Sequence, residues 1–351
     1  MAAGKAHATH DPLPSPASAV VHEAGAAPLP VRLLLFVGAC GSVCPLLAWG
    51  YGLGSFQTFA LVIGLPCVAA LVVAAIWMDR TGRWPVARSA ILAGAIGGLL
   101  GTLAYDLFRV PFVYGLGLQL LAPIDSYGVL LLRADTSSPL TAFSGWAYHF
   151  TNGIGFGIAY AVVATGRSWR WGLAWGLLLE TVVVLSPFAG RSGLVSDGQV
   201  AWLSIRLAYL AHGPYGTIVG LFGQHTLGRA ADARSLLRSP VLVLVWLLVA
   251  GLVGWHQPWR SATEGQSPHV ASEAPAAVVM DGRFVPLWLR VPVGGCALVV
   301  NGDQKTIRLS AGATVEPGAS VEVCSSKPGT QRVRVDDGPF SGGWLLVDPA
   351  E

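Results

Sequence analysis

Charged side chains are scarce in this chain of 351 residues, because only 12% are Asp, Glu, Lys or Arg. An ordinary soluble domain carries about 25% charged residues, so a soluble globular protein is excluded. The 22 Lys and Arg against 19 Asp and Glu leave a formal net charge of +3. These charges fall between apolar runs and form no basic face, so nucleic acid is not an expected partner. The partner that the composition implies is the lipid bilayer.

Familiar enzyme signatures are also missing. The sequence contains no His-Glu-x-x-His run, no Gly-x-Ser-x-Gly elbow and no Gly-Lys-Ser/Thr phosphate loop. The sequence therefore leaves open whether the protein is an enzyme, and it names no substrate.

Long apolar runs dominate what is present. A hydrocarbon core of about 30 Å needs roughly 20 apolar residues in a helix, since only a helix satisfies its own backbone groups there. About seven such spans are expected within a polytopic domain over 31–256. They run approximately over 32–50, 57–78, 90–108, 143–164, 171–187, 201–223 and 240–255.

Basic residues occur in alternate loops, and short cytoplasmic loops retain Lys and Arg. They are Arg80, Arg83 and Arg88; Arg167 and Arg170; and Arg229, Arg234 and Arg238. This pattern predicts a cytoplasmic N-terminus and an exported C-terminus in a bacterial plasma membrane. Residues 1–30 have no apolar core of signal-peptide type, so a disordered cytoplasmic segment is expected there. The stretch 110–140 is longer than a connection needs and is expected to be an outer re-entrant or interfacial piece.

Glycines recur at four-residue spacing within the expected spans, which lets helix backbones approach closely in lipid. The pairs are Gly94 with Gly98, Gly97 with Gly101, Gly153 with Gly157, and Gly172 with Gly176. We expect them to mark helix packing.

The composition changes after the last span. Residues 257–277 are rich in Pro, Ser, Ala and Glu, which is typical of a linker. From Val278 to Glu351, short alternating runs are separated by Gly, Pro, Asn and Asp turns, which predicts a small all-β sandwich. The expected strands are 283–291, 297–300, 306–309, 320–324, 331–335 and 344–347. The predicted orientation places this domain in the periplasm or outside the cell.

Several turn motifs in this domain resemble the cupredoxin (plastocyanin-like) family. The segments that carry the resemblance are Asp281-Gly282-Arg283-Phe284-Val285-Pro286, Val291-Pro292-Val293-Gly294, Val300-Asn301-Gly302-Asp303, Pro317-Gly318, Pro328-Gly329-Thr330 and Gly342-Gly343. The resemblance covers the last fifth of the chain and implies a β-sandwich.

The residues that would bind copper in that family are not present. A type 1 copper site needs imidazole and soft sulfur ligands. The sequence has Thr306, Ile307 and Arg308 where the first His is expected, and Val335 about where the Cys is expected. Residues 336–339 supply no second His. The resemblance therefore implies the fold without its copper site.

Cys296 and Cys324 are the only cysteines in this exported domain. An oxidising compartment favours a structural disulfide between them, which would contribute about 3 kcal/mol by the loop-entropy model. Free thiols or copper binding through these sulfurs are the alternatives. A second pair, Cys40 and Cys44, lies at i and i+4 in the first span, a spacing that suits a soft ion such as Cu(I). Thiols in an apolar helix are more often inert packing residues.

Ionisable residues inside apolar spans are costly, at about 2.5–3.5 kcal/mol each on insertion scales, so each needs a partner or a purpose. The candidates for a shared ligand or proton site that opens outward are Asp106, His149, Asn152, Glu180, Arg206 and His212. Two of them have simpler interpretations. Asp106 could pair with Arg109 at i+3, and Arg206 could snorkel or pair with Asp197.

The remaining candidates have alternatives as well. Either His could be a neutral packing residue. Glu180 needs to be protonated, paired with Arg206 or a His, or bound to a cation. His149, Glu180 and His212 lie on three different spans and could together hold a divalent metal with one open position.

Three hypotheses about function follow. The first is binding or passage of a small polar or metal-ion ligand at this intramembrane site, with the β-domain as a lid or docking module. The second is a membrane-embedded metal-dependent hydrolase that acts on a lipid-like substrate. The third is an assembly role, in which the β-domain recruits a membrane or periplasmic protein.

Overall fold

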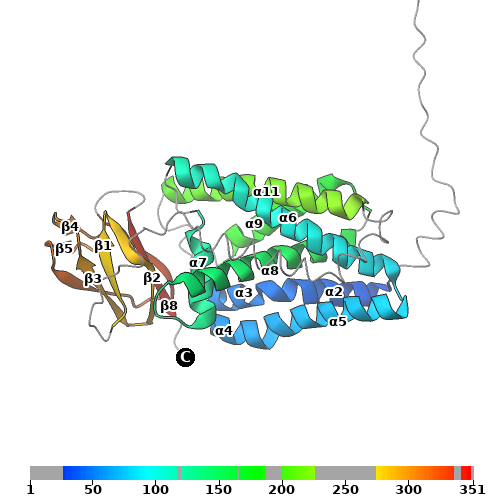
Figure 1. Cartoon of the computed structure of the whole chain (residues 1–351), viewed down its shortest axis with the longest axis horizontal. Coiled ribbons are helices and arrows are strands. Elements are labelled where there is room, and N and C mark those ends of the chain that lie inside the picture. Colours follow the sequence, from blue (N-terminus) through cyan, green and yellow to red (C-terminus); the bar gives the residue numbers. More distant parts are fainter. Residues whose placement is uncertain are drawn as a thin grey trace, which may run out of the picture.

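The computed structural model describes residues 27–116, 120–164, 166–186, 199–225, 274–335 and 341–348. The predicted disordered N-terminus up to residue 26, the predicted seventh span at 240–255 and the linker up to residue 273 lie outside the described residues. The described part contains a helical N-terminal region and a C-terminal β region, as the sequence predicts (Figure 1).

Helices cover the other six predicted spans. Their bounds are α2 Leu29–Cys40, the 3₁₀ segment η1 Gly41–Val43, α3 Cys44–Tyr51, α4 Phe56–Phe59, the π-helical segment η2 Ala60–Gly64, α5 Leu65–Thr81, α6 Pro85–Leu116, α7 Ala122–Leu132, α8 Pro139–Ala164, α9 Trp169–Leu185 and α11 Gln199–His225. Among the described residues, three helical stretches are by length and composition apolar enough to cross a membrane, namely Leu29–Tyr51, Phe56–Thr81 and Pro85–Val113.

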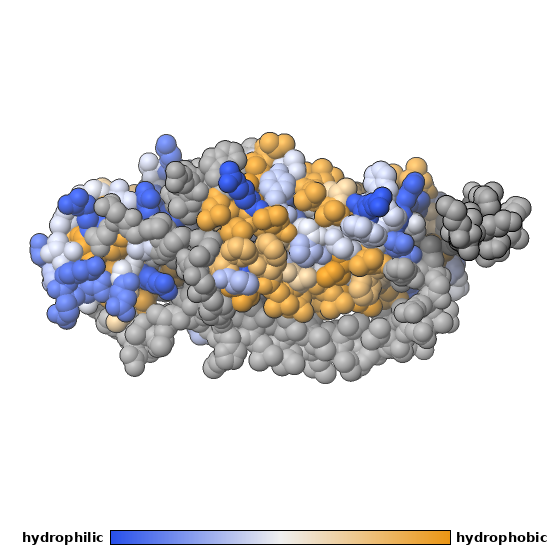
Figure 2. Space-filling view, turned by 90° about the horizontal axis from the view of Figure 1, so that it is seen from above, coloured by the Kyte–Doolittle hydropathy of each residue, from blue (hydrophilic) through white to orange (hydrophobic). Residues whose placement is uncertain are grey.

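The long helices lie side by side in one elongated bundle. α6 packs against α8 and α11, α11 also packs against α9, and α2 and α5 lie next to each other beside α8 (Figure 1). Hydrophobic residues cover much of the visible bundle surface, while hydrophilic residues gather on the β region at one end (Figure 2). This distribution is that of a lipid-facing bundle with one water-facing domain.

For the stretch 110–140 the sequence predicts an outer re-entrant or interfacial piece, and the structure shows helical segments there. α6 continues to Leu116 with Pro111 inside it. The chain then forms α7, whose residues are mostly buried. Figure 1 shows α7 between the long helices and the strands β2 and β8. The sequence did not predict that α7 belongs to the contact between the two regions.

The β region is a curled sheet of six strands in the order β6-β3-β1-β2-β8-β7, with a separate β4-β5 pair. The strands are β1 Ala276–Met280, β2 Arg283–Pro292, β3 Cys296–Asn301, β4 Ile307–Arg308, β5 Thr314–Val315, β6 Ser320–Cys324, β7 Gly329–Val333 and β8 Gly342–Asp348. β1 begins within the predicted linker, and neither β1 nor β5 was among the predicted strands. The predicted disulfide between Cys296 and Cys324 is confirmed, and it joins the paired strands β3 and β6.

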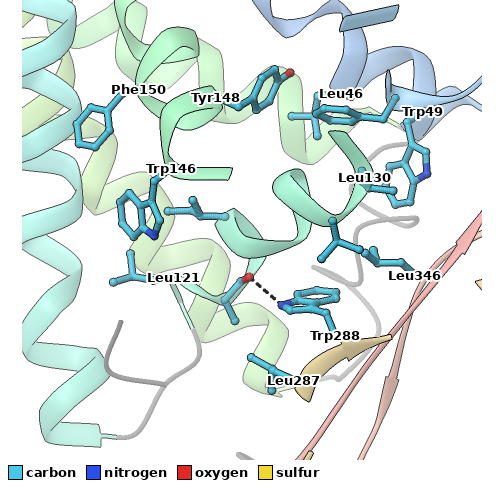
Figure 3. Close-up of a cluster of buried hydrophobic side chains, with 14 of the residues drawn as sticks. Leu46, Trp49, Leu121, Leu130, Trp146, Tyr148, Phe150, Leu287, Trp288 and Leu346 are labelled. Atoms are coloured by element: carbon cyan, nitrogen blue, oxygen red, sulfur yellow. Dashed lines mark hydrogen bonds between the residues drawn. The ribbon is translucent and has the colours of Figure 1, made fainter. Parts of the chain in front are cut away.

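Alternation along β2 and β8 gives the sheet two apolar faces, since successive side chains of a strand point to opposite sides. Leu289 and Leu345 belong to the core of the β region itself. Trp288 and Leu346 instead join a cluster with residues of the helical region, among them Leu130 of α7 (Figure 3). The indole Nε1 of Trp288 donates to the carbonyl oxygen of Ala122 at 3.1 Å.

Backbone pairing strengthens this contact. Residues 135–137 run antiparallel to β2, with a bridge between Thr136 and Leu289. The Ser137 amide donates to Trp288 O at 3.1 Å, and the Arg290 amide donates to Asp135 O at 2.8 Å. The connection between α7 and α8 therefore extends the sheet by one short strand, which fixes the β region to the bundle at two adjacent points.

Candidate functional site

Glycines bring α6 and α8 into backbone contact. A Cβ atom on Gly94 would lie 2.5 Å from Ile158 Cα, and one on Gly98 would lie 2.8 Å from Ile154 Cα. Conversely, a Cβ on Gly157 would lie 2.6 Å from Gly98 Cα. The glycine spacing predicted such packing, and these contacts confirm it.

A second pair of helices repeats the arrangement. A Cβ on Gly176 of α9 would lie 2.5 Å from the carbonyl oxygen of His212 on α11, and Gly172 meets Gly216 and Gly220. Helices α8 and α11 share the spacing His-x-x-x-Gly-x-x-x-Gly, which begins at His149 in α8 and at His212 in α11. Because this spacing repeats every four residues, the His and the two glycines lie on one side of each helix.

The contact between α6 and α8 brings Asp106 to His149. Nε2 of His149 lies 3.1 Å from both carboxylate oxygens of Asp106. Arg109 forms a buried ion pair with the same carboxylate and donates from a second nitrogen to Leu120 O at 2.9 Å. Asp106 is therefore held between a guanidinium and an imidazole. The i+3 pairing with Arg109 was one of the predicted alternatives, and it occurs together with the contact to His149.

The contact between α9 and α11 brings Glu180 to His212. Nδ1 of His212 lies 3.4 Å from Glu180 Oε2 and 2.9 Å from Ala208 O. A carbonyl oxygen can only accept, so Nδ1 of His212 carries a proton in this contact. Of the predicted partners for Glu180, a His is the one that the structure provides.

Tyr105 lies between the two carboxylate and imidazole pairs. Its ring centroid is 6.1 Å from that of His149 and 4.7 Å from that of His212. The guanidinium carbon of Arg109 lies 4.1 Å from the same centroid, a cation–π distance. The six side chains Tyr105, Asp106, Arg109, His149, Glu180 and His212 are called the polar cluster below. It is built from α6, α8, α9 and α11.

The remaining two predicted site residues lie in different surroundings. Asn152 is buried one turn after His149 on α8, and its Oδ1 has no hydrogen-bond partner among the described residues. Arg206 is exposed on α11, and its predicted alternative partner Asp197 lies outside the described residues. The structure therefore buries Asn152 one turn from His149 and places Arg206 on the surface.

A metal site among His149, Glu180 and His212 stays a prediction. Within the part of the chain that the structure describes, the one group of three ligand atoms within 4.8 Å of one another belongs to Cys296, Glu322 and Cys324. Its two sulfurs form the disulfide, so they are not free to bind an ion. An ion held by the polar cluster would require its imidazoles to move toward each other.

Comparisons with known proteins add little. No protein-family model matches the chain, and no curated protein matches it. Two solved structures of amicyanin, a reduced variant and an oxidised variant, match over a short stretch. Each is 16% identical, covers 23% of this chain and 87% of the amicyanin chain, and gives a TM-score of 0.21. At that score the likeness supports no conclusion about function.

The predicted set of site residues does not include Tyr105 or Arg109, although Arg109 was considered as a partner of Asp106. Arg109 lies four positions after Tyr105 and three positions after Asp106. Because residues at these separations are neighbours on a helix surface, one face of α6 carries all three side chains. This helical spacing could have predicted that all three side chains of α6 belong to the site.

Proposed function

We propose that this chain is an integral membrane protein that binds or passes a small polar or metal-ion ligand at the polar cluster. In this proposal the bundle has seven spans, the N-terminus is cytoplasmic, and the C-terminal domain is an exported cupredoxin-like sandwich without copper ligands. The observation that carries the proposal is the pair of carboxylate and imidazole contacts on either side of Tyr105. Buried ionisable groups in membrane helices are functional by default because they are costly to insert.

The balance of charge favours a cation or a proton as the ligand. Arg109 neutralises Asp106 through their ion pair. Glu180 is 6% exposed and contacts His212, whose Nδ1 proton is also directed to a backbone carbonyl. A buried carboxylate is stabilised by protonation or by a cation beside it. Both imidazoles also have a second ring nitrogen, and neutral imidazole is a common ligand for borderline metal ions.

The β-domain lies close enough to the cluster to act as a docking module. Arg109 donates to Leu120 O, and Trp288 donates to Ala122 O, two residues further along the chain. The start of α7 is therefore held from the bundle side by Arg109 and from the β side by Trp288. We propose that α7 and the β-domain together cover the outer end of the cluster.

Binding of Zn²⁺ to the full chain in lipid nanodiscs tests the proposal. The chain carries Cys40→Ser, Cys44→Ser and Cys67→Ser, so that free thiols do not contribute. We expect one saturable site per chain. The His149→Ala/His212→Ala variant should weaken it by more than about tenfold, because the loss even of an outer-shell partner costs about 10–100-fold in metal affinity.

The control is Arg206→Gln, since Arg206 is exposed and lies outside the polar cluster. It should bind Zn²⁺ as the parent does. A parent chain that binds no Zn²⁺, or a double variant that binds it equally well, would contradict the cation form of the proposal.

The other two hypotheses remain alternatives. A metal-dependent hydrolase would use the same His149, Glu180 and His212 to hold zinc, and it predicts turnover of a lipid-like substrate that chelation abolishes. An assembly role would use the β-domain to recruit a membrane or periplasmic protein. It predicts capture of a protein partner that survives replacement of both His residues.

A further inference from the structure

All of the free cysteines of this chain meet at one helix contact. Two of its five cysteines form the disulfide, and Cys40, Cys44 and Cys67 are free. Cys40 ends α2, Cys44 begins α3, and Cys67 is the third residue of α5. The thiol of Cys44 lies 3.9 Å from the carbonyl oxygen of Cys40.

Cys67 reaches the same place from the neighbouring helix. A Cβ atom on Gly41 would lie 2.5 Å from Cys67 Cβ and closer still to its sulfur. Cys67 therefore occupies the position where a side chain of residue 41 would begin. Gly41–Val43 is a 3₁₀ turn, in which positions i and i+3 lie on the same side, so Cys44 follows Gly41 on the side that faces Cys67. The thiol of Cys44 is thus placed beside both Cys40 and Cys67.

The backbone is irregular on both sides of this contact. Gly41–Val43 is a 3₁₀ turn, and Ala60–Gly64 is a π-helical turn. The two segments face each other, because a Cβ on Gly64 would lie 3.8 Å from Gly41 O. π-helical turns are rare and occur frequently at functional sites. Each turn comes just before a proline, Pro45 or Pro66, which removes a backbone hydrogen bond of its helix, and both turns lie where the two helices approach.

Cysteine sulfur is a soft ligand, and soft thiolates in proteins select Cu(I), zinc and iron–sulfur clusters. Structural zinc is almost always bound by four ligands, whereas this contact offers three sulfurs. Among the described residues, no His, Asp or Glu joins these cysteines in a group with ligand atoms within 4.8 Å. We propose that Cys40, Cys44 and Cys67 form a binding site for one Cu(I) ion. Each thiol that ligates releases its proton on binding.

The site closes around the ion by side-chain rotation. The three sulfurs do not all lie within 4.8 Å of one another. Each Cys side chain can turn about its Cα–Cβ bond between staggered positions, and this moves the sulfur without moving the backbone. The missing side chain at Gly41 leaves the space for Cys67 to approach Cys44.

Competition for Cu(I) against bicinchoninate tests this proposal on the full chain in nanodiscs under anaerobic conditions. We expect one Cu(I) per chain, with sulfur ligands in its X-ray absorption spectrum. Cys67→Ser and, separately, Cys44→Ser should each weaken binding at least about tenfold, since even outer-shell changes cost that much. The triple Cys→Ser variant should leave all Cu(I) with the chelator. Ser42→Ala, a buried change on the same turn, should bind Cu(I) as the wild type does.

Near-ultraviolet circular dichroism identifies variants that fail to fold. If either Cys44→Ser or Cys67→Ser does not fold, the other single variant still tests the proposal. A wild-type chain that leaves Cu(I) with the chelator would overturn the proposal. So would a folded triple variant with wild-type affinity, or folded single variants with unchanged affinity. Stoichiometric Zn²⁺ at the thiols without Cu(I) binding would overturn the choice of ion.

Discussion

At the scale of single residues, the most exacting environment is that of Asp106. Its carboxylate is 8% exposed and faces both Arg109 and His149. Arg109 contacts in turn the face of Tyr105 and the carbonyl of Leu120. Breaking a buried ion pair is costly because it leaves an uncompensated charge, whereas neutral replacement of both partners is often tolerated.

Replacement of Arg109 alone should therefore destabilise the protein. We expect Arg109→Gln to cost about 3–5 kcal/mol of unfolding free energy, because Asp106 then keeps only an imidazole partner. The double variant Asp106→Asn/Arg109→Gln should recover more than half of that loss. Thermal unfolding in nanodiscs, followed by tryptophan fluorescence, measures both. A single variant as stable as the wild type would show that the ion pair carries no net stabilisation.

At the scale of elements, the glycine contacts decide which helices present their polar residues to each other. Asp106 and His149 are 43 residues apart, and Glu180 and His212 are 32 apart. Each pair meets where two helix backbones approach without intervening side chains. In lipid, such close packing supplies much of the attraction between helices.

A methyl group at one of these contacts should separate the helices. A Cβ on Gly98 would lie 2.8 Å from Ile154 Cα, which is backbone that cannot give way cheaply. We expect Gly98→Ala to cost about 1–3 kcal/mol through overpacking. Gly38→Ala is the control, because its nearest neighbour is Leu71 Cδ2 at 3.7 Å, an ordinary contact. If the two variants unfold at the same temperature, the contact between α6 and α8 is not tight.

The same scale shows how far sequence reasoning reaches. Helices lie at six of the predicted spans because uninterrupted apolar runs are a strong signal. The first two residues of β1, Ala276 and Ala277, were assigned to the linker because Ala is common in that segment, and α7 was not predicted as a helix. The pairing of Asp106 with Arg109 follows from helical spacing. The pairing of Asp106 with His149 does not, since one sequence contains no information on which helices touch.

At the scale of the whole molecule, α7 joins the two regions. On one side it packs against α8, and on the other it meets Trp288 of the sheet (Figure 3). Trp288 stacks on Trp344, with ring centroids 5.3 Å apart, and the guanidinium of Arg332 lies 5.3 Å from the Trp344 centroid. Side-chain contacts therefore run without interruption from Arg332 of β7, through Trp344 and Trp288, to α7. This continuity favours a docked cover over a loosely tethered lid.

The central claim is that the two carboxylate and imidazole pairs form one site around Tyr105. A double-mutant cycle on Zn²⁺ affinity, with His149→Ala, His212→Ala and their combination in the thiol-free chain, tests it most directly. If both residues act on one ion, the two losses should be non-additive, with a coupling energy within the range of about 0.5–3 kcal/mol found for interacting residues. Losses that add within about 0.3–0.5 kcal/mol, as for independent positions, would show two separate pairs and contradict the claim.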